Sequence, residues 1–272
     1  MTVQKRVASQ DMPDVQGSED SRRIAINKVG VKDIRYPITL KCPATGGSQH
    51  TVAKVNMYVN LPHYQKGTHM SRFLEVLNRH HESIRSDQLL SICHDMKLRL
   101  HAEEAHLELS FPYFIDKKAP VTGQVGKIDI EVTIECSSNS KDDLVLGLKV
   151  PATSLCPCSK EISRYGAHNQ RCEIEVKVRF AQGRYMWIEE LFDVVERAAS
   201  MQVFAVLKRP DEKYVTEAAY ENPKFVEDIV RDLALALNRE DRICWYQLNS
   251  TNYESIHNHN AYAFIEHDKR QD

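Results

Sequence analysis

The alternation of apolar and polar residues in the first half of the chain predicts four β-strands, with two helices between the second and the third. The segments with the two-residue period of a strand are residues 33–40, 51–61, 106–114 and 127–137. Residues 71–81 and 86–102 carry apolar side chains three and four positions apart, which is the period of an amphipathic helix. The polar segment 137–143 ends this half.

The second half of the chain repeats the order strand, strand, helix, helix, strand, strand. Its strand-like segments are residues 143–153, 172–180, 242–255 and 261–267, and its helical segments are residues 187–207 and 221–238. The second helix is expected to open with Asn222 as its cap and Pro223 in its first turn.

This order predicts an α+β protein that consists of two similar modules in tandem. In each module, an antiparallel four-stranded sheet would carry two helices on one face. We place a polar arm at residues 1–30, the first module at residues 31–140 and the second at residues 141–272. The other face of the sheet also has apolar residues, so we expect a second sheet or another subunit to cover it, and the protein to be an oligomer.

Composition and charge exclude several classes of partner. The 272 residues include 36 basic and 38 acidic side chains, a formal net charge of −2, which does not indicate a nucleic-acid or membrane partner. Charges are scattered through residues 1–23, so we expect neither a signal peptide nor a membrane anchor there. Seven widely spaced cysteines do not resemble a secreted disulfide framework, and we expect free thiols in the cytoplasm.

Residues 154–172, SLCPCSKEISRYGAHNQRC, are the densest group of potential metal ligands and nucleophiles in the chain. Cys156, Cys158 and His168 offer thiolate and imidazole donors, which suit zinc and are tolerable for iron or manganese. A structural zinc site needs four ligands, and no second cysteine knuckle is present. A three-ligand site with an open position and one donor from elsewhere fits better. The residues alone leave open that these are ordinary buried thiols and that His168 caps a loop. A redox dithiol is disfavoured by the intervening Pro157.

Several long blocks of the chain resemble the prokaryotic type IB GTP cyclohydrolases. The blocks are PATSLCPCSKEISRYGAHNQR (residues 151–171), MPDVQ (12–16), YQKGTHMSRF (64–73), RPDEKYVTEAAYENPKFVEDIVRD (209–232) and ESIHNHNAYA (254–263). The resemblance implies the tunnelling fold, with two modules in one chain. It also implies a homotetramer whose active sites lie at subunit interfaces.

The same resemblance implies an activity and a set of site residues. GTP and water would give 7,8-dihydroneopterin triphosphate and formate, the first step of tetrahydrofolate and pterin synthesis. One divalent metal (Zn, Mn or Fe) would be held by Cys156, His168 and Glu212, and would activate water for attack on C8 of guanine. His257 would be the general acid and base that transfers protons during ring opening. His259 would have a supporting role.

Substrate binding is implied at two further places. Glu227 lies off the apolar stripe of its predicted helix, so the pattern alone indicates a solvated charge, whereas the resemblance implies a carboxylate that accepts from guanine N1–H and N2–H₂. Lys66, His69 and Arg72 surround a glycine just before a predicted helix start, which suits a triphosphate.

Two alternatives stay open at this point. The first is another enzyme of this fold, a queuosine-pathway nitrile reductase, although its characteristic motif is not visible in the chain and the pair Cys156 and His168 has no role in its chemistry. The second is a non-catalytic, zinc-stabilised assembly. The sequence also leaves open which metal is used, which residues contact the triphosphate, and what Cys158 and His259 do. It does not decide whether the product is the triphosphate or a cyclic phosphate.

Overall fold

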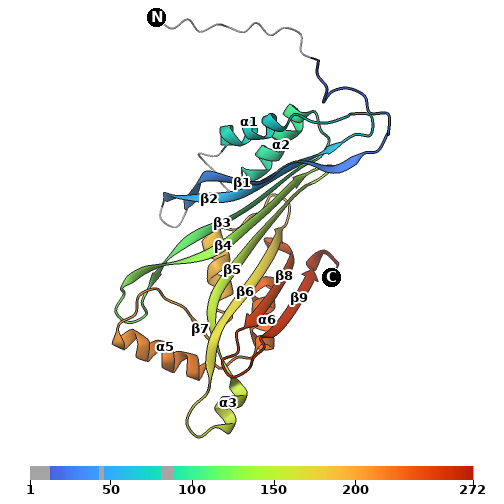
Figure 1. The fold of residues 1–272 in the computed structure, drawn as a ribbon. Helices are drawn as coiled ribbons and strands as arrows, with labels where there is room; N and C mark the ends of the chain where they lie inside the picture. Colours follow the sequence, from blue (N-terminus) through green and yellow to red (C-terminus); the bar gives the residue numbers. More distant parts are fainter. Residues whose placement is uncertain (1–12, 43–45, 81–87, 272) are drawn as a thin grey trace, which may run out of the picture.

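A single antiparallel sheet organises the computed structural model, which describes residues 13–42, 46–80 and 88–271 (Figure 1). Within these residues the strand order is β1-β2-β3-β4-β5-β6-β8-β9, and β7 pairs with β5. The strands are β1 (Ile26–Cys42), β2 (Gly47–Leu61), β3 (Ala105–Lys118), β4 (Val125–Ser138), β5 (Asp142–Leu155), β6 (Asn169–Phe180), β7 (Met201–Gln202), β8 (Ile243–Asn252) and β9 (Ala261–Asp268). The helices are α1 (Met70–His80), α2 (Leu89–Leu100), α3 (Pro157–Ile162), α4 (Ile188–Glu196), α5 (Arg209–Glu221) and α6 (Val226–Asn238), followed by the 3₁₀ turn η1 (Lys269–Gln271). The predicted α+β class is confirmed.

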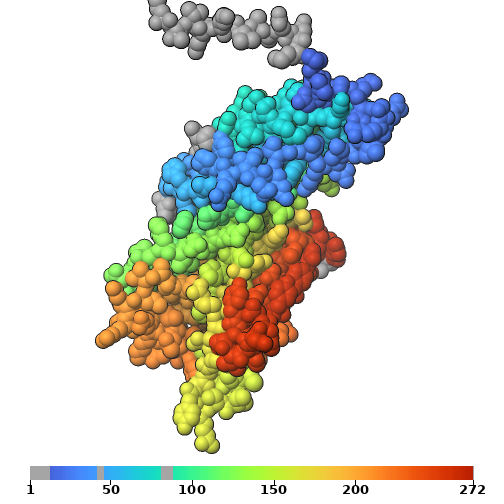
Figure 2. All heavy atoms as spheres, viewed as in Figure 1, coloured from blue at the N-terminus to red at the C-terminus, as the bar shows by residue number. Residues whose placement is uncertain are grey.

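Alternate residues of the strands pack on one side of the sheet, together with α1, α2, α4 and α6. Their side chains form one core, in which Met57, Leu107, Ile174 and Leu248 are almost fully buried. The sheet runs without a break from the first half of the chain into the second because β4 pairs with β5. Figure 2 shows the resulting elongated body, with the chain around α3 projecting at one end. Among the described residues, no helix has the length and apolarity that crossing a membrane would need.

The outer face of the sheet is mixed, because exposed apolar side chains such as Val52 and Phe114 lie on it beside charged residues. It is therefore less apolar than predicted. Ion pairs run across the neighbouring strands: Lys149 Nζ lies 2.9 Å from Glu173 Oε1, and Lys177 Nζ lies 2.7 Å from Glu135 Oε1. Most of the buried apolar residues of β5 and β6 belong to the core on the helix-bearing side.

β1 is longer than the predicted strand at residues 33–40. Its register with β2 shifts between Val31 and Ile34, and Asp33 has φ of 60°. Asn56 Oδ1 accepts a hydrogen bond from the Asp33 backbone N–H at 2.8 Å, which stabilises the bulge. A bulge adds one residue to one strand, so it interrupts the two-residue alternation on which the prediction depended.

The helices of the second half differ from the prediction at four places, of which the first is the short helix α3, which was not predicted. The helix expected over residues 187–207 ends at Glu196, and β7 follows it. Residues 209–221 form α5, which was not predicted. Asn222 caps the end of α5 instead of opening the next helix, because its backbone N–H donates to Ala218 O and Ala219 O at 3.2 and 3.3 Å. Its side-chain amide donates to Ala199 O and Ser200 O at 3.2 and 3.0 Å, which connects this end of α5 to the chain before β7. The next helix, α6, begins at Val226.

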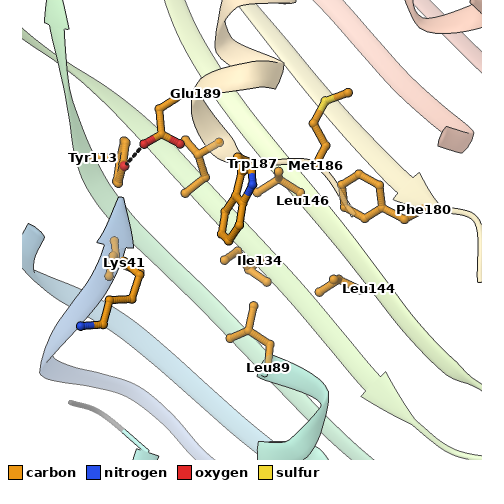
Figure 3. A pocket seen from close by; sticks show the side chains of 12 residues that line it. Lys41, Leu89, Tyr113, Ile134, Leu144, Leu146, Phe180, Met186, Trp187 and Glu189 are labelled. Carbon is orange, nitrogen blue, oxygen red and sulfur yellow. Dashed lines mark hydrogen bonds between the residues drawn. The ribbon is translucent and has the colours of Figure 1, made fainter. Parts of the chain in front are cut away.

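A pocket lies over the middle of the sheet on the helix-bearing side (Figure 3). Its lining is mostly apolar, with Leu146 and Trp187 among the residues that point into it. Tyr113 Oη donates to Glu189 Oε1 at 2.6 Å on one side of it. The pocket is next to the first residues of β5 and the last of β6, at the opposite ends of these strands from residues 154–172. It is therefore not the site that the sequence indicated.

Candidate active site

Cys156 and His168 face each other where β5 ends and β6 begins. Leu155 and Asn169 are the last register partners of these strands, and the backbone N–H of Cys156 donates to His168 O at 3.1 Å. Residues directly opposite in an antiparallel pair project to the same face, with Cβ atoms about 4.5–5.5 Å apart. Both residues are partly exposed. The strand pairing therefore brings a thiol and an imidazole together at an accessible position.

The turn between the two strands holds this pair in place. Cys156 is the N-cap of α3, and its Sγ accepts from the Ser159 N–H at 3.4 Å. Ser159 Oγ accepts in turn from the backbone N–H of His168 at 3.2 Å. Pro157 occupies the first helical position, where its missing N–H costs nothing. Cys158 is exposed within α3 and is not opposite His168.

The start of α6 is joined to the same end of β5. Lys224 N–H donates to Leu155 O at 3.0 Å, and Ser154 Oγ donates to Lys224 O at 3.1 Å. Glu227 lies exposed in the first turn of α6, off the buried stripe, as the pattern predicted. Phe225, which the pattern assigned to that stripe, is 44% exposed because it precedes the helix.

The loop between β8 and β9 carries His257 and His259 at this end of the molecule. Tyr253 N–H donates to Arg171 O at 3.0 Å, which attaches the start of the loop to β6. Both histidines are exposed, and their rings stack with centroids 5.0 Å apart. The loop can thus present an imidazole next to the Cys156 and His168 end of the sheet.

Glu212 is not brought into a metal cluster with Cys156 and His168. It is exposed in the first turn of α5, and no three His, Cys, Asp or Glu side chains among the described residues are grouped to hold a metal ion. Its neighbour Asp211 is fully buried and accepts from the backbone N–H groups of Val121 and Thr122 at 2.9 and 2.8 Å. Asp211 therefore fixes α5, and Glu212 with it, on the turn between β3 and β4.

The electrostatics of Asp211 agree with this structural role. Burial raises the pKa of its carboxyl, but the hydrogen bonds that Thr122, Lys208 and Val121 donate outweigh burial and hold the pKa well below its ordinary value. Sequence reasoning missed this residue because a buried carboxylate in a polar helix has no periodic signal.

Lys66, His69 and Arg72 lie near the start of α1, at the opposite end of the molecule from α3 (Figure 1). His69 Nε2 lies 3.3 Å from Asp14 Oδ1, and Arg72 Nη1 donates to Arg99 O at 3.1 Å. Lys66 is exposed. One chain therefore does not bring these cations to the pair formed by Cys156 and His168.

Gln170 is a further residue that sequence reasoning missed. It is 7% exposed, and its Oε1 lies 3.0 Å from His168 Nδ1. Its only sequence signal is its place two residues after His168 on a strand, which puts both side chains on one face.

Comparison with known proteins identifies the family of the chain. The family model described as "Type I GTP cyclohydrolase folE2" matches residues 12–263. The proteins named "GTP cyclohydrolase FolE2" of Magnetococcus marinus and Geobacter sulfurreducens are 57% and 55% identical to this chain. The matches cover 95% and 96% of this chain, and 97% and 100% of those proteins.

The solved structures bear on the fold alone. A uricase from Bacillus fastidious superposes with a TM-score of 0.51 at 11% identity, over 90% of this chain and 94% of that one. The urate oxidase from Bacillus subtilis 168 gives 0.50 at 9% identity, over 90% and 100%. These neighbours have the tunnelling fold. Because the family model matches nearly the whole chain, the protein belongs to the type I GTP cyclohydrolase FolE2 family.

Proposed function

We propose that this chain is a metal-dependent GTP cyclohydrolase that converts GTP and water to 7,8-dihydroneopterin triphosphate and formate in the cytoplasm. The observation that carries the proposal is the pairing of Cys156 with His168 across the ends of β5 and β6. Hydrogen bonds of Lys224 attach the start of α6 to the same end of β5, so the helix that carries Glu227 lies beside the pair. Family membership supports GTP as the substrate.

The donor set of this pair fits a divalent ion. A thiolate and an imidazole nitrogen are good zinc ligands and acceptable ligands for iron or manganese. Cys156 and His168 would hold the ion, with Glu212 as the third donor. When bound, such an ion supplies the Lewis acidity that makes water nucleophilic at neutral pH.

The chain's own residues would then bind guanine and move protons. The carboxylate of Glu227 accepts from N1–H and N2–H₂ of guanine together, so adenine, which lacks both donors, is rejected. His257 donates and accepts protons at the ring nitrogens as the imidazole ring of guanine opens. Its exposed position on a loop lets it approach a substrate held near α6.

We further propose a homotetramer of tandem tunnelling-fold modules, residues 31–140 and 141–272, with active sites between chains. What supports this is the distance between the two groups of site residues within one chain: Lys66 and Arg72 near α1 and Cys156 near α3 (Figure 1). One bound GTP is too short to contact both groups of residues when they lie at opposite ends of the same chain. Cations from a neighbouring chain would bind it instead.

The test is turnover of GTP by metal-loaded protein, followed by formate release and pterin fluorescence. Chelation should abolish turnover while the protein stays folded, because a catalytic ion with an open position need not support the fold. The Cys158→Ser variant is the matched control for the Cys156 thiolate. It changes an exposed thiol two residues away, so its turnover should fall only slightly. Full turnover after complete removal of metal would contradict the proposal, and unfolding on chelation would favour a zinc-stabilised assembly.

A further inference from the structure

Gln170 lies between His168 and a buried polar cluster that connects β5, β6, β8 and the start of α6. Its side chain contacts His168, Ser154 and Glu254. We propose that Gln170 is a positioning residue that keeps the proton of His168 on Nδ1, so that the Nε2 lone pair is available to a metal. This inference rests on the proposed metal-dependent function.

The contact between the two side chains has two possible interpretations. His168 Nδ1 and Gln170 Oε1 are 3.0 Å apart. If the amide oxygen faces the ring, Nδ1 carries the hydrogen and donates. If the amide NH₂ faced the ring, Nδ1 would accept, and the neutral imidazole would carry its hydrogen on Nε2, where it would block a metal. The orientation of the Gln170 amide therefore decides the tautomer.

Ser154 provides the first constraint on that amide. Ser154 is 1% exposed, and its hydroxyl has one hydrogen, which it donates to the backbone carbonyl of Lys224 at 3.1 Å. A carbonyl can only accept, so this hydrogen is not available to Gln170. The hydroxyl oxygen accepts from Asn252 Nδ2 at 3.0 Å and has one lone pair left for the Gln170 atom at 3.4 Å. That atom must be a donor, and is therefore the amide nitrogen.

Glu254 provides the second constraint independently. Its Oε1 lies 3.4 Å from the same Gln170 nitrogen. An ionised carboxylate only accepts, so it also requires the NH₂ group of Gln170 to face it. Ser154 of β5 and Glu254 of the loop after β8 thus turn Nε2 of Gln170 away from the ring and direct Oε1 towards His168.

The strand geometry explains why Gln170 can do this. His168 and Gln170 are two positions apart, so both project to the same face at the start of β6. Asn252 is 2% exposed, and its Nδ2 reaches Ser154 from β8. Since metal-binding histidines depend on the partner of their other ring nitrogen, loss of that partner weakens metal binding about 10–100-fold in known sites.

The test combines the tautomer of His168 with metal affinity. Metal-free protein labelled with ¹⁵N-histidine is examined by NMR at a pH where imidazoles are neutral, and the His168 signals are assigned by their loss in His168→Gln. The expected result is Nδ1–H in the wild type and a mixed or Nε2–H state in Gln170→Leu. Gln170→Leu should also bind Co²⁺ about 10–100-fold more weakly in competition with a fluorescent chelator.

Two further variants separate positioning from structure. In the double variant Gln170→Glu/Glu254→Gln, residue 170 still offers an acceptor to His168, and the hydrogen bond between residues 170 and 254 has its donor and acceptor exchanged. This variant should therefore bind Co²⁺ within a few fold of the wild-type affinity. Gln247→Leu, which changes a glutamine of β8 outside the cluster, is the matched control and should bind Co²⁺ as the wild type does.

The proposal is overturned if wild-type His168 carries its proton on Nε2, or if Gln170→Leu binds Co²⁺ with wild-type affinity. Failure of the proposed function looks different. Wild-type protein that binds no Co²⁺ at all would reject the metal site, while the tautomer measured on metal-free protein would still decide the role of Gln170.

Discussion

Replacing Glu227 by Gln separates guanine recognition from folding. Glu227 is exposed in the first turn of α6, and its side chain makes no hydrogen bond or ion pair with any described residue. The buried stripe of the helix is formed by other residues, including Ile229 and Leu233. Glu227→Gln should therefore change the free energy of unfolding by less than about 0.5 kcal/mol, as for most surface substitutions.

The effect on substrate binding should be much larger. A carboxylate accepts from guanine N1–H and N2–H₂ together, whereas the amide of Gln accepts one bond and turns its own NH₂ towards the other donor. A donor left without a partner costs about 1–3 kcal/mol, and more when the lost partner was charged. We therefore expect GTP affinity or turnover to fall at least about tenfold, since 1.4 kcal/mol is a factor of ten.

The assay is GTP binding and steady-state kinetics on metal-loaded protein, with inosine triphosphate as a second substrate. Inosine triphosphate lacks the N2 amine, so the preference of the wild type for GTP should shrink in Glu227→Gln. Glu221→Gln, which changes the last residue of α5, is the matched control and should behave as the wild type. Wild-type affinity and turnover in Glu227→Gln would refute the reasoning and leave Glu227 as a solvated charge.

Three other predictions follow from the site. Cys156→Ala should lose both metal and turnover, as measured by metal analysis and formate release, whereas exposed Cys158 should tolerate Ser; equal losses would indicate a site with two thiolates. His257→Ala should keep its metal and bind GTP but lose about two to four orders of magnitude in rate, and loss of metal would make His257 a ligand. The lowered pKa of Asp211 stabilises the fold fully above its unfolded pKa of about 3.9, and this contribution is lost as pH falls towards the lower folded value. Urea unfolding of Asp211→Asn should accordingly depend less on pH below about 4 than that of the wild type, and identical pH profiles would contradict this assignment.

Strand periodicity was sufficient for most of the sheet. The strands of the second half appear close to the predicted ranges because one face is buried and the alternation is regular, as in Ile174, Val176 and Val178 of β6. The prediction was wrong where apolar residues follow one another without a clear period. Residues 187–207 read as one helix, but the chain leaves α4 after Glu196 to pair with β5 through β7.

Helix α5 could not be predicted from periodicity because it hardly packs on the core. Only Asp211 and Ala219 are buried in it, and the buried carboxylate replaces the usual apolar stripe. Its position depends on hydrogen bonds to Val121 and Thr122, which lie about ninety residues earlier in the chain. The position of Glu212 follows from these contacts and not from local sequence.

The pair formed by Cys156 and His168 is the part of the site that could be predicted from the sequence. Both residues border predicted strands, and the register of β5 with β6 places them opposite each other. Periodicity within one chain has no information about contacts between chains, so the place of Lys66 relative to this pair could not be derived from it.

The most direct test of the central claim follows the C8 carbon of GTP. Metal-loaded protein is mixed with GTP labelled with ¹³C at C8, and the reaction is observed by NMR beside the Cys156→Ala variant. The proposed activity predicts that the C8 signal becomes formate in equal amount to the pterin product, and that the variant leaves GTP unchanged. A C8 signal that stays in the purine, or formate without pterin, would contradict it.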